Sequence, residues 1–164
     1  MRRLWIGFLA AASAVCFWML AKTGTDAAKL LPARVLVIEE RDGTVCVSSD
    51  NGAAGCGKTL AAALQQMERS AGGVLFLDTA EHIVLLRPTQ ALLEQAITQP
   101  SFRPAAKLYV SRAEKSDAFA LVEFLRAHPG KLTLSQACAA LLRGEPLRPA
   151  VLKTTEEGDV TLGE

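Results

Sequence analysis

The sequence predicts a small α/β (α+β) domain behind one N-terminal transmembrane helix. Three observations predict this class. Residues 4–20 form an uncharged apolar run, Asp42-Gly43 separates two β-rich segments, and short apolar runs then alternate with segments of helical spacing. A chain of 164 residues with a formal net charge of +1 accommodates one such domain with a modest core. It carries no basic run interleaved with aromatic residues, so we expect no nucleic-acid partner.

Residues 1–21 are predicted to be a membrane anchor or signal segment. A helix rises about 1.5 Å per residue, so the run at 4–20 is just long enough to span the ~30 Å apolar layer of a bilayer. Arg2 and Arg3 precede the run and would hold that end in the cytoplasm, which places the domain outside the cell membrane. Two alternatives use the same segment: cleavage after the A-x-A-like residues 12–14, and lipid attachment at Cys16.

The first half of the domain is predicted to begin with a β-hairpin. Residues 22–33 form a tether, and strands at about 34–40 and 44–49 flank a type I′ turn. Residues 51–57 contain three glycines and are expected to be a loop. A helix with apolar residues at helical spacing follows from Thr59 to about Arg69, and two glycines end it.

The second half adds strands and helices in turn. Strands are expected at about 73–78, 82–86 and 106–112, and helices at 88–98, 117–128 and 135–143. Ser116-Asp117 caps the middle helix, and Gly144 ends the last one. The predicted architecture is therefore a small mixed sheet flanked by three to four helices over residues 34–144. Residues 145–164 show little apolar periodicity and are predicted to be an extended tail.

The stretch GAAGCGKT at 52–59 matches the phosphate-binding pattern G-x-x-x-x-G-K-[ST]. In that pattern the glycines turn backbone N–H groups toward phosphate, the lysine reaches the outer phosphates and the hydroxyl helps to hold magnesium. The residues that would bind a nucleotide or another anion in this way are Gly52, Gly57, Lys58 and Thr59, with Asp78 as a second magnesium anchor. Glu81 could orient a water molecule.

Three observations favour a structural explanation of these letters. Nucleoside triphosphate is scarce outside the membrane, the first strand pairs through a tight hairpin and not through a long parallel crossover, and four polar residues precede Gly52. A flexible glycine turn and a helix N-cap at Thr59 explain the same sequence. We therefore expect no catalytic residues and no cofactor, with the nucleotide- or anion-binding function as the alternative.

The cysteines and histidines do not form a recognisable ligand set. Cys46, Cys56 and Cys138 lie outside the apolar run, and one disulfide between two of them cannot be assigned from sequence. His82 and His128 lack companions at metal-ligand spacing, so no metal site is expected. We expect a structural role for His82 at a strand edge.

Four segments carry a family resemblance. They are GKTLAAAL (57–64), VLFLDTAEHIVLL (74–86), TQALLEQAI (89–97) and AKLYVSRAEKSDAFALVEFL (106–125). In this order they resemble the N-terminal domain of the C subunit of bacterial spore germinant receptors (Ger(x)C-like), over roughly residues 33–128. The resemblance implies that GKT begins a helix in a non-enzymatic domain. That family is lipid-anchored at a cysteine followed by Trp and Asp and continues for two further domains, whereas this chain has Cys16-Phe17-Trp18 inside its apolar run.

Together these inferences predict a single-pass, membrane-anchored, extracytoplasmic interaction or assembly domain. The resemblance implies a role in sporulation or germination. The expected partners are the membrane and other membrane or spore-associated proteins, with no nucleic acid and no small-molecule substrate assigned.

Overall fold

The computed structural model describes residues 30–113, 116–154 and 160–163. The predicted anchor at 1–21 and most of the tether at 22–33 lie outside these residues. In the part of the chain that is described, no helix combines the length and apolar character needed to cross a membrane.

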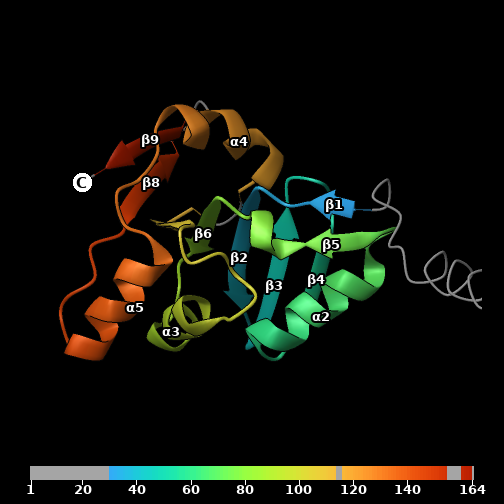
Figure 1. The fold of residues 1–164 in the computed structure, drawn as a ribbon, viewed down its shortest axis with the longest axis horizontal. Helices are drawn as coiled ribbons and strands as arrows, with labels where there is room; N and C mark the ends of the chain where they lie inside the picture. Colours follow the sequence, from blue (N-terminus) through green and yellow to red (C-terminus); the bar gives the residue numbers. More distant parts are fainter. Residues whose placement is uncertain (1–29, 114–115, 155–159, 164) are drawn as a thin grey trace, which may run out of the picture. The chain divides into compact units, whose positions relative to one another are not determined.

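The central feature is a seven-stranded mixed sheet (Figure 1). Its order is β4-β3-β2-β6-β7-β8-β9. Four neighbouring strands are parallel, and they are β2 (Val35–Arg41), β6 (His82–Leu86), β7 (Lys107–Ser111) and β8 (Ala150–Thr154). The remaining strands are antiparallel to their neighbours, with β3 (Thr44–Ser49) and β4 (Ala54–Gly57) at one edge and β9 (Val160–Gly163) at the other. The predicted mixed α/β class is confirmed.

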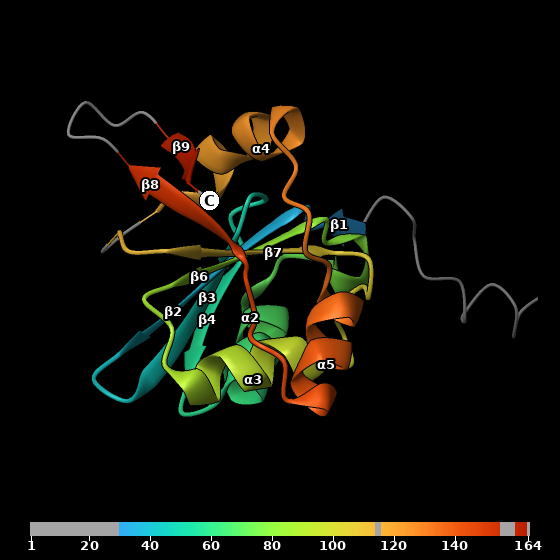
Figure 2. The same cartoon turned by 90° about the vertical axis from the view of Figure 1, so that its left-hand side faces the viewer.

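Helices cover both faces of this sheet (Figure 2). One face carries α2 (Leu60–Ser70), α3 (Gln90–Thr98) and α5 (Leu134–Arg143), and the other carries α4 (Ala118–Ala127). Successive residues of a strand point to opposite faces. Ile83 and Leu85 therefore join the larger core beneath three helices, while Val84 and Leu86 join the core beneath α4. Burial on both faces explains why β6 is apolar without alternation.

Local signals place the hairpin turn and the helix starts within two residues of the predicted positions. Asp42 and Gly43 have φ values of 49° and 72°, and positive φ at both positions characterises a type I′ hairpin turn. Four helices begin after a residue whose side chain accepts a backbone N–H, and these N-caps are Thr59, Thr89, Asp117 and Thr133. Gly144 closes α5 with a φ of 67°.

The expected strand at 73–78 is shorter than predicted and lies outside the main sheet. β5 (Val74–Phe76) pairs with β1 (Leu30–Pro32) in a separate two-stranded sheet, and a 3₁₀ turn, η2 (Leu77–Thr79), follows. The predicted tether is therefore wrong at its end. Ala33 is fully buried, and its backbone N–H donates to Thr79 Oγ1 at 3.2 Å. A three-residue strand is too short to produce a detectable alternation.

The prediction of an extended tail at 145–164 is wrong for β8 and β9, which extend the main sheet. β8 pairs in parallel with β7, and Leu152 is only 2% exposed in the core beneath α4. The buried Ser111 Oγ also donates to the Leu152 carbonyl oxygen at 3.1 Å. The sequence conceals this strand because Leu152 is its only fully buried residue among those whose burial is described.

Candidate functional site

The GAAGCGKT stretch forms a strand and a helix start, so the predicted loop at 51–57 is wrong in its second half. Ala54–Gly57 is β4, which pairs antiparallel with β3 at the edge of the sheet. Gly52 lies in the turn before β4 with a φ of 84°, whereas Gly57 ends the strand. A four-residue strand spans about 13 Å, so the two glycines are held apart and do not wrap around one phosphate group.

The glycines of β4 have a different role, which is close packing against α2. A Cβ atom on Gly55 would overlap the Met67 backbone nitrogen and would lie 2.5 Å from the Ala63 carbonyl oxygen. A Cβ on Gly57 would lie 2.7 Å from the Ala63 backbone nitrogen. Any side chain at either position would collide with the helix backbone, so the spacing of these glycines follows from the strand–helix contact.

The other residues of the phosphate-loop alternative do not converge on a common point with Gly52. The Thr59 hydroxyl accepts the Ala62 N–H at 3.2 Å as the N-cap of α2. Lys58 is exposed beside it. Asp78 is exposed in η2 and does not end a strand of the main sheet, where a magnesium anchor was expected.

Two of the three cysteines beyond the apolar run form a disulfide. Cys46 of β3 lies directly opposite Cys56 of β4 in the antiparallel register, and their sulfur atoms are bonded. Cys138 is free and half-buried on α5, packed against the larger core. The pairing depends on β4, which the sequence did not reveal.

A second group of polar residues gathers where β2, β6 and β7 begin. The parallel register aligns Val35 with His82 and His82 with Lys107, so these three residues form the first row of the sheet. Their side chains lie on the face that α4 covers, because Val35 and Tyr109 belong to the core beneath that helix. Glu81 immediately precedes His82 and is exposed.

His82 is held by a buried hydrogen-bonded chain. The hydroxyl of the fully buried Tyr109 accepts the Gly130 N–H at 2.8 Å and lies 3.0 Å from His82 Nδ1. Because the hydroxyl accepts a hydrogen bond from Gly130, its own O–H can donate a hydrogen bond to Nδ1. The neutral imidazole then carries its hydrogen on Nε2. Gly130 has no space for a side chain, because a Cβ there would lie 2.9 Å from Tyr109 Cε1.

Burial sets the protonation of this pair. Desolvation lowers the pKa of His82, the Glu81 carboxylate opposes that shift and the Lys107 ammonium adds to it. Desolvation also raises the pKa of Tyr109, against the opposing influence of the Gly130 N–H. Both shifts favour the neutral forms that the hydrogen-bonded chain requires.

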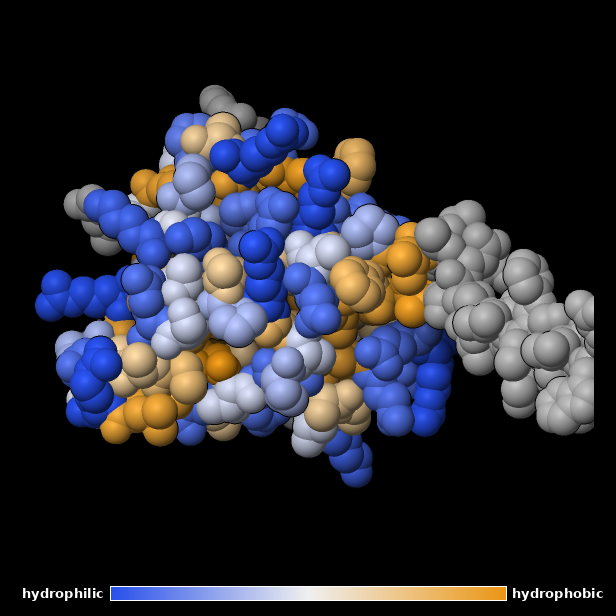
Figure 3. Space-filling view, viewed as in Figure 1, coloured by the Kyte–Doolittle hydropathy of each residue, from blue (hydrophilic) through white to orange (hydrophobic). Residues whose placement is uncertain are grey.

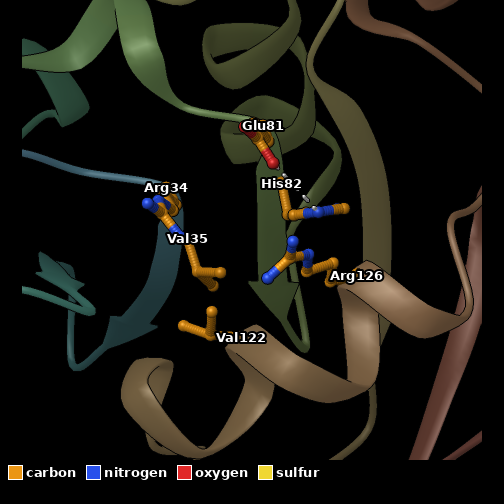
Figure 4. A pocket seen from close by; sticks show the side chains of 6 residues that line it. All are labelled: Arg34, Val35, Glu81, His82, Val122 and Arg126. Carbon is orange, nitrogen blue, oxygen red and sulfur yellow. Dashed lines mark ion pairs between the residues drawn. The ribbon is translucent and has the colours of Figure 1, made fainter.

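Two hollows open beside His82 and share Glu81, His82 and Arg126 in their walls. Their volumes are about 200 and 250 Å³. Arg34 lines the first, and Arg103 and Lys107 line the second. Figure 4 shows Arg126 extending from α4 into the space between Val35 and His82.

The cations of these hollows have no ion-pair partner in the part of the chain that the structure describes. Among the residues that the structure describes, no ion pair or side-chain hydrogen bond involves Arg34, Arg103, Lys107 or Arg126. The single carboxylate in the walls, Glu81, lies 4.0 Å from His82 Nε2. With neutral His82, the walls carry four positive charges and one negative charge. The described residues contain no group of three or more His, Cys, Asp or Glu side chains that could hold a metal ion.

This group was not predicted from the sequence. His82 is predicted to have a structural role at a strand edge; the structure places it at the start of the central strand β6, buried and 3.0 Å from the Tyr109 hydroxyl. The available signal was that Arg34, Glu81 and Lys107 each lie within one residue of the start of a predicted strand. They become neighbours only when those strands are known to be parallel.

The fold and the site together define a mixed α/β domain with four parallel central strands, antiparallel strands at both edges and a cationic hollow at the amino ends of the parallel strands. In comparisons with family models, curated proteins and solved structures, none matches this chain.

Proposed function

We propose that the protein is a membrane-anchored, extracytoplasmic domain that associates with other proteins and is not an enzyme. Residues 1–21 would anchor it, and the folded part would lie outside the cell membrane. The observation that carries the proposal is the Cys46–Cys56 disulfide. Disulfides persist in oxidising compartments and are rare in the cytosol, so the bond agrees with the outward orientation that Arg2 and Arg3 predict.

An apolar area on β5 supports the association part of the proposal. Val74 and Phe76 are 47% and 43% exposed, and Figure 3 shows apolar surface in the region of β1 and β5. Adjacent apolar side chains on a surface strand favour contact with another protein. The resemblance of residues 33–128 to the germinant-receptor subunit suggests the setting, which is an assembly of membrane proteins during sporulation or germination.

The orientation can be tested on the full-length protein in its membrane. Alkaline phosphatase fused after Glu164 should be active, because that enzyme folds only in an oxidising compartment. The unreduced, denatured protein should expose at most two of its four cysteines to a maleimide reagent, and reduction should add two more. A Cys46→Ser variant should lose that increment. An inactive fusion together with four reactive thiols before reduction would overturn the proposal.

A further inference from the structure

We propose that the hollows beside His82 bind a phosphomonoester group, and we name this surface the amino-edge site. It is formed by Arg34, His82, Arg103, Lys107 and Arg126, with Glu81 at its rim. The site is separate from the GAAGCGKT stretch, which forms β4 and ends at Thr59, the N-cap of α2. The proposal goes beyond the proposed function and does not depend on which side of the membrane the domain occupies.

The first argument is that four cations without an ion-pair partner among the described residues come from separate parts of the chain. Arg34 precedes β2, Lys107 begins β7 and Arg126 lies in the last turn of α4. Unpaired surface cations are common, but here four of them border two hollows that share three wall residues. Like charges around one hollow repel each other, and a bound anion would relieve that repulsion.

The second argument is the surplus of charge. With Glu81 and Arg126 common to both, Arg34 leaves the first hollow with a surplus of one positive charge, and Arg103 and Lys107 leave the second with a surplus of two. A phosphomonoester carries a charge of about −1.5 to −2 at pH 7 and offers three acceptor oxygens, whereas a carboxylate carries one charge on two oxygens. Arginine matches phosphate with two parallel N–H donors, and three of the four cations are arginines.

The third argument is that the floor of the site is fixed. The first row of the sheet is tied together by backbone hydrogen bonds, since the His82 N–H donates to the Arg34 carbonyl oxygen at 3.0 Å and the Lys107 N–H donates to the Glu81 carbonyl oxygen at 2.8 Å. The Tyr109 hydroxyl fixes the orientation of the His82 ring through its hydrogen bond with Nδ1. In the neutral form assigned above, His82 carries its remaining proton on Nε2, on the side of Glu81. A ligand would therefore need to order only the long cationic side chains.

The test is calorimetric titration of the full-length protein in detergent micelles with inorganic phosphate, at constant ionic strength and pH 7.5. Arg126→Gln should weaken binding about tenfold, because a hydrogen bond between charged groups is lost. Glu81→Gln should tighten binding, because a repelling carboxylate is removed. Arg69→Gln, a matched change at an exposed arginine on α2 that lines neither hollow, should leave binding unchanged.

The outcomes are distinguishable. No heat beyond that of an equal titration with sodium chloride would overturn the proposal, as would equal affinities of the wild type and Arg126→Gln or tighter binding of acetate than of phosphate. Reconstitution into nanodiscs would then identify the source of the group. Phosphatidic acid that competes with inorganic phosphate would assign a lipid headgroup, and failure to compete would assign a soluble phosphate compound. Failure of the topology test with phosphate binding intact would reject the proposed function alone.

Discussion

Tyr109 illustrates how much one residue contributes to this fold. Its ring belongs to the core beneath α4, while its hydroxyl joins the Gly130 N–H to His82. A buried polar group costs free energy unless it is hydrogen-bonded. These two hydrogen bonds provide partners for two side chains and one backbone N–H at once. The sequence contains one tyrosine, and nothing local identifies its partners, which lie 27 and 21 residues away.

At this scale we predict a pH dependence of stability that involves His82. Its pKa in the folded protein is lowered by burial, so the unfolded chain takes up the proton first as the pH falls below about 6.5. The free energy of unfolding should therefore decrease from that pH downward, by at most about 1.4 kcal/mol per pH unit, until the folded-state pKa is reached. Denaturant unfolding between pH 7.5 and 5 measures this slope.

The groups that face His82 provide the comparison variants. His82→Asn offers an amide oxygen near the place of Nδ1 and cannot titrate, so the slope should flatten even if the overall stability falls. Lys107→Gln removes a charge that lowers the pKa of folded-state His82. The pH interval over which the free energy of unfolding decreases should therefore become narrower. Arg34, Glu81 and Arg126 also border the ring and remain unchanged in both variants. Equal slopes in the wild type and His82→Asn would show that this histidine does not carry the effect.

The helices and strands differ in how well the sequence predicts them. Thr59 and Asp117, the two N-caps predicted from the sequence, lie directly before α2 and α4, because an N-cap is a local interaction. The helices predicted from 88 and 135 begin at Gln90 and Leu134. The hairpin at Asp42-Gly43 is equally local. Strand pairing is not local: β4, β8 and β9 are recognisable only through the strands beside them. The amino-edge site depends on that pairing. The sequence therefore contains its residues but does not indicate that they are neighbours in the fold.

The contact between β4 and α2 gives a prediction at the scale of elements. Gly55→Ala should destabilise the protein by about 1–3 kcal/mol, because its Cβ would lie within 2.7 Å of three backbone atoms of α2 and the helix must shift. Gly72→Ala is the matched control, since a Cβ there meets nothing within 4 Å. That change should be neutral or slightly stabilising, by reducing the entropy of the unfolded chain. Thermal unfolding of the two variants tests the contact, and equal melting temperatures would contradict it.

At the scale of the whole molecule, the question is where the domain ends. The sequence predicts its last folded residue near Gly144, whereas the structure adds β8 and β9 to the main sheet. Without β8, the Tyr109–Ser111 edge of β7 would lose its parallel partner, and the core beneath α4 would lose Leu152. Removing β8 would therefore expose an edge of the buried strand β7, and an exposed strand edge is a place where other chains can pair.

Leu152 and Leu162 therefore provide a matched pair of substitutions. They face each other in the β8–β9 register, but Leu152 is 2% exposed and Leu162 is 37% exposed. Leu152→Ala removes a buried side chain and should cost about 2–5 kcal/mol, with a lower midpoint in urea and an unchanged slope. Leu162→Ala should cost well under half as much, because its side chain already contacts solvent. If residues 145–164 were an unpacked tail, neither substitution would change the urea midpoint. An unchanged midpoint for Leu152→Ala would therefore support a domain that ends near Gly144.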